Sequence, residues 1–284
     1  MGEWRVAGRT CLVTGASSGI GQEVARALAE RGAHVVMGCR SGARGEAARA
    51  RITASTGNPH VEVMEVDTAS QASLRRFARA FTGQHHELAV LINNAGMWST
   101  TRQLSPEGIE LTWATNVLGY FLLTNLLLPT LRASAPARII NVASKLARDL
   151  ELSDVQFTRR HYSGMTAYAQ SKQANRMWTY ALERRLAGSG VTTYVVHPGG
   201  VNTGIFRKGG GLSGLGAGLY MRLFGKTVQQ GADTVVYLAT DPRVSSRSGR
   251  YWAYRQETPC RFRNEQEEER LWSLCKEMTS GSGA

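Results

Sequence analysis

Short apolar runs alternate with longer amphipathic segments along the first third of the chain. The run TCLVT at 10–14 is followed by a segment, 19–31, whose apolar residues recur at helical spacing. Gly32 then ends that helix. The same alternation continues and predicts strands at 34–38, 61–66 and 88–93, with helices at 42–56 and 70–82.

The second half continues this pattern with longer helices. We predict helical segments at 105–131, 166–187 and 228–239, and strands at 137–143, 191–197 and 249–254. Alternating strands and helices predict βαβ units, and therefore an α/β fold: a single-domain Rossmann-type doubly wound parallel sheet of about seven strands with helices on both faces. No change in composition marks a second domain, so residues 1–284 are expected to form one dinucleotide-binding and catalytic domain.

The most apolar stretch, residues 117–131, is shorter than a membrane span and contains Asn125 and Pro129. We predict a buried helix there and no transmembrane segment. The first residues lack an apolar signal sequence. No two of the four cysteines form a CxxC pair, so no metal site is expected, and reduced thiols fit a cytoplasmic compartment.

Two segments are predicted to be irregular. Residues 204–225 include the glycine-rich stretch KGGGLSGLGAGLY, which follows a strand and could form a flexible substrate lid. A surface excursion without a role in binding is the alternative. The tail, about 278–284, is expected to be disordered.

The net charge is +12, and 29 of the 34 basic residues are arginines. Such an excess can serve nucleic acid, an anionic membrane or an anionic ligand. The arginines are scattered from Arg5 to Arg270 without a block of like charges, so we expect a solvated basic surface and no nucleic-acid partner.

A glycine-rich turn, TGASSGIG at 14–21, joins the first strand to the first helix. Glycines there allow a tight turn and let backbone N–H groups approach a pyrophosphate at the helix N-terminus. The turn predicts a dinucleotide site formed by Gly15, Ser17, Ser18, Gly19, Ile20 and Gly21.

Further motifs follow in a fixed order. The spacing TGxxxGxG, the NNAG at 93–96, the YxxxK formed by Tyr168 and Lys172, and the HPG at 197–199 resemble the classical short-chain dehydrogenases/reductases from about residue 8 to 255. The C-terminal GRYWAY and the segment EEERLWSLCKEM resemble the retinol-dehydrogenase-like and WW-domain-oxidoreductase-like branch.

The resemblance implies four catalytic residues, Asn116, Ser144, Tyr168 and Lys172. Tyr168 would exchange a proton with the substrate oxygen, and an ammonium at Lys172 favours its phenolate. Ser144 precedes Tyr168 by 24 positions, about twice the usual gap, and Ser153 and Ser163 are nearer in sequence. We choose Ser144 because it follows a parallel strand directly, which makes residues 145–163 an insertion. A surface loop without a substrate role is the simpler interpretation of that insertion.

The second strand predicts which dinucleotide binds. Cys39 stands where NAD-specific members of the family carry an acid, and Arg40 follows it. An arginine can bind a 2′-phosphate, so NADP(H) is favoured over NAD(H). Arg44 is interpreted as a solvated helix residue. The resemblance adds further cofactor residues: Asp67, which could instead cap a helix, then Asn94, Ala95, Gly96, Tyr168, Lys172, Pro198, Gly199, Val201 and Thr203.

These features together predict an NADP(H)-dependent oxidoreductase for an apolar aldehyde, ketone or alcohol, a retinal-like compound being one candidate. Two alternatives remain: an NAD-dependent alcohol dehydrogenase, and a dinucleotide-sensing scaffold of the same fold that performs no chemistry. The resemblance also allows a homo-oligomer, a dimer or tetramer.

Overall fold

The computed structural model describes residues 4–199 and 227–281. Within these ranges the strands form one eight-stranded sheet in the order β3-β2-β1-β4-β5-β6-β7-β8. All neighbouring strands are parallel except the pair β7 and β8. The predicted Rossmann-type fold is therefore confirmed, with a two-residue edge strand added. The strands are β1 Thr10–Thr14, β2 His34–Cys39, β3 Val61–Glu65, β4 Val90–Asn93, β5 Ala137–Val142, β6 Val191–Val196, β7 Arg250–Ala253 and β8 Gln256–Glu257.

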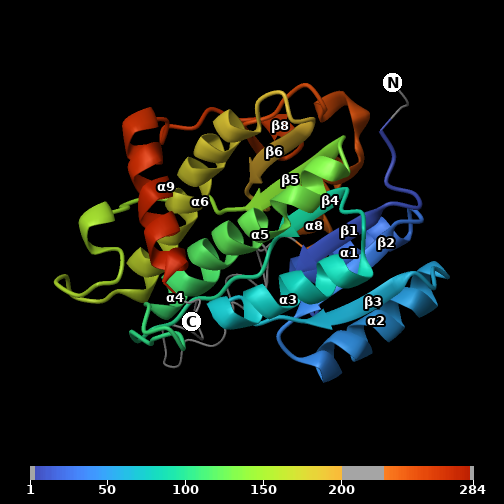
Figure 1. Ribbon diagram of the computed structural model, residues 1–284, viewed down its shortest axis with the longest axis horizontal. Helices are drawn as coiled ribbons and strands as arrows, with labels where there is room; N and C mark the ends of the chain where they lie inside the picture. Colours follow the sequence, from blue (N-terminus) through green and yellow to red (C-terminus); the bar gives the residue numbers. More distant parts are fainter. Residues whose placement is uncertain (1–3, 200–226, 282–284) are drawn as a thin grey trace.

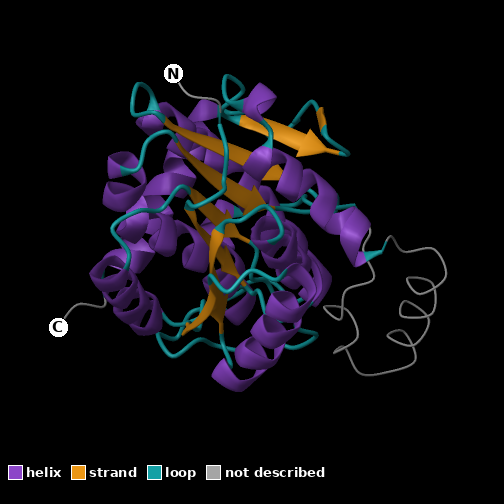
Figure 2. Ribbon diagram, turned by 90° about the vertical axis from the view of Figure 1, so that its right-hand side faces the viewer, coloured by secondary structure: helices purple, strands orange, loops and turns teal. Residues whose placement is uncertain are grey.

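Helices cover both faces of the sheet (Figures 1 and 2). The apolar residues of α1, α2 and α8 share one core with one face, while those of α3, α5, α6 and α9 share a second core with the other. The helices are α1 Gly19–Ala29, α2 Gly42–Thr56, α3 Gln71–Gln84, α4 Leu111–Trp113, α5 Gly119–Ala133, α6 Gly164–Leu186, α8 Val228–Thr240 and α9 Glu265–Ser280; shorter turns are η1 Ala114–Leu118, η2 Leu152–Asp154 and η4 Pro242–Val244.

The helical segment expected over 105–131 begins later than predicted. Residue Leu104 pairs with Glu110 in an isolated bridge, and helical structure starts at Leu111. The Glu110 carboxylate accepts from the backbone N–H groups of Thr112 and Trp113, at 2.9 and 2.7 Å. A buried acidic cap thus sets the helix start, which hydrophobic spacing alone does not reveal.

The tail was predicted to be disordered from about residue 278, and this is wrong for 278–280. Helix α9 continues to Ser280 because side chains of α3 bind its last carbonyl groups. Gln71 Nε2 donates to the Met278 carbonyl at 2.8 Å, and Arg75 donates to that of Thr279 at 2.5 Å. Such contacts between distant segments leave no local sequence pattern. The lid predicted at 204–225 lies outside the described residues.

One stretch among the described residues, Leu111–Ala133, is long and apolar enough to cross a membrane, with a mean hydropathy of 1.3. In the structure 78% of its most apolar window is buried inside the protein. The buried helix predicted at 117–131 therefore lies where it was expected.

Candidate active site

The glycine turn between β1 and α1 is closely packed. Gly15 and Gly19 have φ angles of 67° and 57°, which disfavour other residues. A Cβ on Gly21 would lie 2.4 Å from Asn94 Nδ2. The Ser18 side chain does not cap α1, so it leaves the first backbone N–H groups of this helix to other partners. These features suit a bound pyrophosphate.

Thr14, the first residue of the TGxxxGxG motif, joins this turn to the end of β4. The Thr14 hydroxyl accepts from the backbone N–H groups of Asn94 and Ala95, at 2.9 and 3.1 Å, and the Asn94 side chain donates to the Thr14 carbonyl at 2.9 Å. A Cβ on the adjoining glycine, Gly96, would lie 3.5 Å from Asn116 Oδ1 and 3.6 Å from Lys172 Nζ. The NNAG segment therefore meets Asn116 and Lys172, two of the predicted catalytic residues, at one edge of the sheet.

At the end of β2, the buried Cys39 thiol occupies the position where an acidic residue would hydrogen-bond the ribose of NAD. Cys39 is only 1% exposed, and burial raises the pKa of its thiol to about 11, against an opposing contact from the Ala16 backbone. Arg40 is exposed beside it. The structure also brings Glu65, the last residue of β3, to this place, where its carboxylate accepts from Gly42 N at 3.1 Å. This acid was missed because it comes from another strand.

Asp67 follows β3 and turns the chain towards α3. Its carboxylate accepts from Ala69 N at 3.0 Å, whereas the N-cap of α3 is Ser70. The helix-capping interpretation of Asp67 is therefore wrong. Among the described residues, no group donates a hydrogen bond to the second oxygen of the Asp67 carboxylate.

Tyr168 and Ser144 meet in the middle of the site. Tyr168 is 7% exposed and lies near the start of α6; Ser144 follows β5. Burial raises the pKa of the Tyr168 phenol, and a hydrogen bond with the Ser144 side chain opposes that shift. Ser144 Oγ also accepts from Leu146 N at 3.2 Å. The choice of Ser144 over Ser153 and Ser163 thus agrees with the geometry.

Lys172 lies one turn after Tyr168 and is 3% exposed. Its ammonium donates to the Val142 carbonyl at 3.1 Å and lies 5.3 and 5.7 Å from the ring centres of Tyr120 and Tyr168. Burial lowers the pKa of Lys172 to about 7. The expected lowering of the Tyr168 pKa by this ammonium is not found, because burial dominates both groups.

Asn116 is fully buried in the π-helical turn η1, a kind of irregularity common at functional sites. Its Oδ1 accepts from Met97 N at 2.8 Å, and its Nδ2 donates to Met97 O and to Ser171 Oγ, each at 3.0 Å. Ser171 Oγ in turn donates to the Tyr168 carbonyl at 2.7 Å. Asn116 therefore connects the NNAG loop with the helix turn that carries Tyr168 and Lys172.

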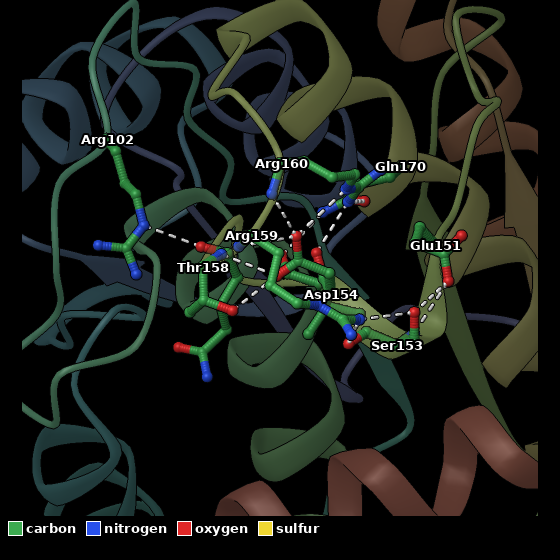
Figure 3. A network of polar contacts seen from close by, with 10 residues as sticks. Arg102, Glu151, Ser153, Asp154, Thr158, Arg159, Arg160 and Gln170 are labelled. Carbon is green, nitrogen blue, oxygen red and sulfur yellow. Dashed lines mark hydrogen bonds and ion pairs between the residues drawn. The ribbon is translucent and has the colours of Figure 1, made fainter.

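A network of hydrogen bonds holds the segment 145–163 together (Figure 3). The Asp154 carboxylate accepts from the backbone N–H groups of Thr158, Arg159 and Arg160, at 2.7, 3.2 and 2.9 Å. Burial alone would raise the pKa of Asp154, but these bonds and the Thr158 hydroxyl hold it below its ordinary value. Arg160 also donates to Gln170 at 3.0 Å, which fastens the insertion to α6 two residues after Tyr168.

Comparison with known proteins identifies the family. The profile described as short chain dehydrogenase matches residues 9–211. Retinol dehydrogenase 12 of Mus musculus is 39% identical over 281 residues, which cover 96% of this chain and 87% of that protein. The chain belongs to the short-chain dehydrogenase family. Its relatives place it in the retinol-dehydrogenase-like branch, as the motifs predicted.

Solved structures agree with the short-chain dehydrogenase assignment. A putative uncharacterized protein from Mycobacterium paratuberculosis is 32% identical with a TM-score of 0.75, covering 98% of this chain and 95% of that one. A putative NAD(P)-dependent gluconate 5-dehydrogenase from Beutenbergia cavernae, solved with bound NADP, is 27% identical with a TM-score of 0.69, covering 89% and 97%.

Members of this family act with a nicotinamide dinucleotide, and the described residues suit that group. The glycine turn has no space for side chains at Gly15 or Gly21, where a Cβ atom would lie under 3.0 Å from Ala95 and Asn94 respectively. Such a turn lets backbone N–H groups approach a pyrophosphate. At the other end, Gly199 N donates to His197 Nδ1 at 2.9 Å, which shapes the turn after β6 and gives the histidine a structural partner. Pro198 lies in this turn. Val201 and Thr203 lie outside the described residues.

Proposed function

We propose that this short-chain dehydrogenase is an NADP(H)-dependent enzyme in which Tyr168 exchanges a proton with the oxygen of an apolar carbonyl or alcohol. The observation that carries the proposal is the hydrogen bond between Tyr168 and Ser144, with the Lys172 ammonium behind the same ring. A scaffold without chemistry would not need these three groups brought together from β5 and α6.

The protonation state of Tyr168 and the position of Ser144 allow a carbonyl to be reduced. Because burial raises the Tyr168 pKa, the phenol is protonated at neutral pH and can donate to a carbonyl oxygen. Ser144 hydrogen-bonds the same oxygen and holds it near the phenol. NADPH supplies the hydride when bound. The Lys172 ammonium, which lies with Asn116 Oδ1 beside Gly96, would then return a proton to the Tyr168 phenolate and regain one from solvent. The oxidation of an alcohol uses the same groups in reverse.

The 2′-phosphate of NADP(H) is assigned to the exposed Arg40. A buried neutral thiol at Cys39 neither repels this phosphate nor accepts from a ribose hydroxyl as an acid would. The negative charge of Glu65 would repel the phosphate, but its carboxylate already accepts a hydrogen bond from Gly42 N at the N-terminus of α2. The remaining cofactor contacts proposed are Gly15, Ser17, Ser18, Gly19, Ile20, Gly21, Asp67, Asn94, Ala95, Gly96, Pro198, Gly199, Val201 and Thr203.

A lipophilic aldehyde, ketone or alcohol is proposed as substrate, since a retinol dehydrogenase is among the relatives. A panel of retinal, medium-chain aldehydes, aromatic ketones and a sugar acid tests this, with turnover read from the absorbance of NADPH and NADH in parallel. Faster turnover of the apolar compounds with NADPH is expected. Turnover confined to the sugar acid, or to NADH, would contradict the proposal. A cytoplasmic location is proposed on the cysteine pattern.

A further inference from the structure

Arg176 is a buried cation one turn after Lys172 on α6. It is 6% exposed, and its described contacts are all with neutral groups. Its Nη2 donates to the Ser144 carbonyl at 2.6 Å and to the Tyr251 hydroxyl at 2.7 Å. The guanidinium carbon lies 3.9 Å from the ring centre of Tyr251 and 5.4 Å from that of Phe262. Its Nε is buried without a hydrogen-bond partner among the described residues.

Stability does not explain a cation in this place. A buried charge without an acidic partner loses more in desolvation than neutral acceptors return, and an apolar side chain of similar length would pack against the same rings at lower cost. The arginine therefore needs another reason to be there.

The partners of Arg176 supply that reason. The Ser144 carbonyl is at the point where the chain leaves β5 and enters the insertion, so holding it fixes the Ser144 side chain beside Tyr168. Tyr251 belongs to β7, and its ring lies 5.8 Å from that of His197, which accepts from Gly199 N. One guanidinium thus links α6 with the end of β5 and with β7, whose Tyr251 packs against His197 in the turn after β6.

We propose that Arg176 is a positioning residue for the reaction: it holds Ser144 in hydrogen-bonding distance of Tyr168 and ties that pair to the turn at Pro198 and Gly199. This inference rests on the proposed function. Arg176 touches neither substrate nor cofactor; it acts through the Ser144 backbone and through Tyr251.

The test compares Arg176→Met with Arg176→Lys. Methionine keeps the length and the packing against Tyr251 and Phe262 but cannot donate, whereas lysine restores one charged donor. We expect Arg176→Met to lower kcat about 10- to 100-fold, the size of effect produced by a small misplacement of a reacting group. KM and the Kd for NADPH should change less than about twofold, the melting temperature should stay or rise, and Arg176→Lys should recover part of the lost kcat.

Arg184→Met is the matched control, because Arg184 is on the same helix but pairs with the buried Glu268 and with Glu269 away from the site. It should lower the melting temperature and leave kcat unchanged. Amide exchange of peptide 143–149, whose Leu146 and Ala147 amides bond to Ser144, supplies a measurement that needs no turnover. Exchange should rise in Arg176→Met and not in Arg184→Met.

The outcomes separate this inference from the function it rests on. Unchanged exchange in peptide 143–149 would overturn the role of Arg176 even if no substrate were found. An active protein whose Arg176→Met variant keeps full kcat would do the same while leaving the proposed function intact. If methionine prevents folding, Arg176→Lys carries the test. A folded lysine variant with a lowered kcat and raised exchange in peptide 143–149 supports the positioning role, and one with wild-type kcat and exchange contradicts it.

Discussion

The side chains of Ser144 and Tyr168 are hydrogen-bonded although 24 positions separate them in the sequence. The insertion between them folds on itself around Asp154 and is fastened to α6 through Gln170, so its length does not move Ser144 out of place. The insertion is therefore held beside Tyr168, where it could contact the substrate.

The substitution Asp154→Asn should destabilise this insertion. Thr158 N donates to one carboxylate oxygen, and Arg159 N and Arg160 N donate to the other. An amide has only one accepting oxygen and cannot keep all three bonds, so the local free energy of opening should fall by about 1–3 kcal/mol. Amide exchange across 150–163 then rises by one to two orders of magnitude, roughly as that energy implies. The KM for substrate should increase without a change in the Kd for NADPH.

Asp149→Asn is the control for that experiment, since the Asp149 side chain is 62% exposed and, within the described part of the chain, forms an ion pair only with Arg148. It should leave exchange and KM as they are. If Asp154→Asn loosens the segment but KM is unchanged, the insertion is a surface loop without a substrate role.

Arg40→Asp should shift the cofactor preference towards NADH. The new carboxylate repels a 2′-phosphate and can accept from a ribose hydroxyl, so the ratio of kcat/KM for NADPH to that for NADH should fall by at least about tenfold, or 1.4 kcal/mol. Arg44→Asp on the exposed face of α2 is the matched charge reversal and should have a much smaller effect. An unchanged ratio in Arg40→Asp would exclude the phosphate role of Arg40.

The buried Lys172 makes stability depend on pH. Burial lowers its pKa from 10.5 to about 7, so the unfolded chain binds more protons than the folded protein between these values. The free energy of unfolding contributed by this group therefore rises with pH from 7 to 10.5, and the folded state carries the full penalty below pH 7.

Lys172→Met removes that dependence. The melting temperature of the variant minus that of the wild type should be largest near pH 7 and should decrease towards pH 10, in the absence of cofactor. Lys276→Met, at an exposed position on α9, should show a difference that does not vary with pH. A pH-independent difference for Lys172→Met would mean that the lysine is not desolvated as the structure indicates.

Local patterns predicted much of this molecule, and contacts between distant segments account for what they missed. The hydrophobic periods of strands and helices predicted the order of the elements, because the apolar face of each element is encoded in its own consecutive residues. Glu65 and Arg176 were missed for the opposite reason: Glu65 reaches Gly42 from a neighbouring strand, and the partners of Arg176 lie on β5 and β7.

The sign of the Tyr168 pKa shift was missed in the same way. The spacing of tyrosine and lysine shows that they share a helix face, but only the packed structure shows that both are buried. Burial then raises the pKa of the phenol and lowers that of the ammonium.

The most direct measurement of the central claim is the single-turnover rate of Tyr168→Phe with NADPH and the best carbonyl substrate of the panel. Phenylalanine keeps the ring beside Lys172 and removes only the proton donor, so the rate should fall by about 100-fold or more while NADPH binds with unchanged Kd. Tyr237→Phe on α8, away from the site, should retain the wild-type rate. A Tyr168→Phe protein that keeps most of its activity would contradict the assignment of Tyr168 as the acid.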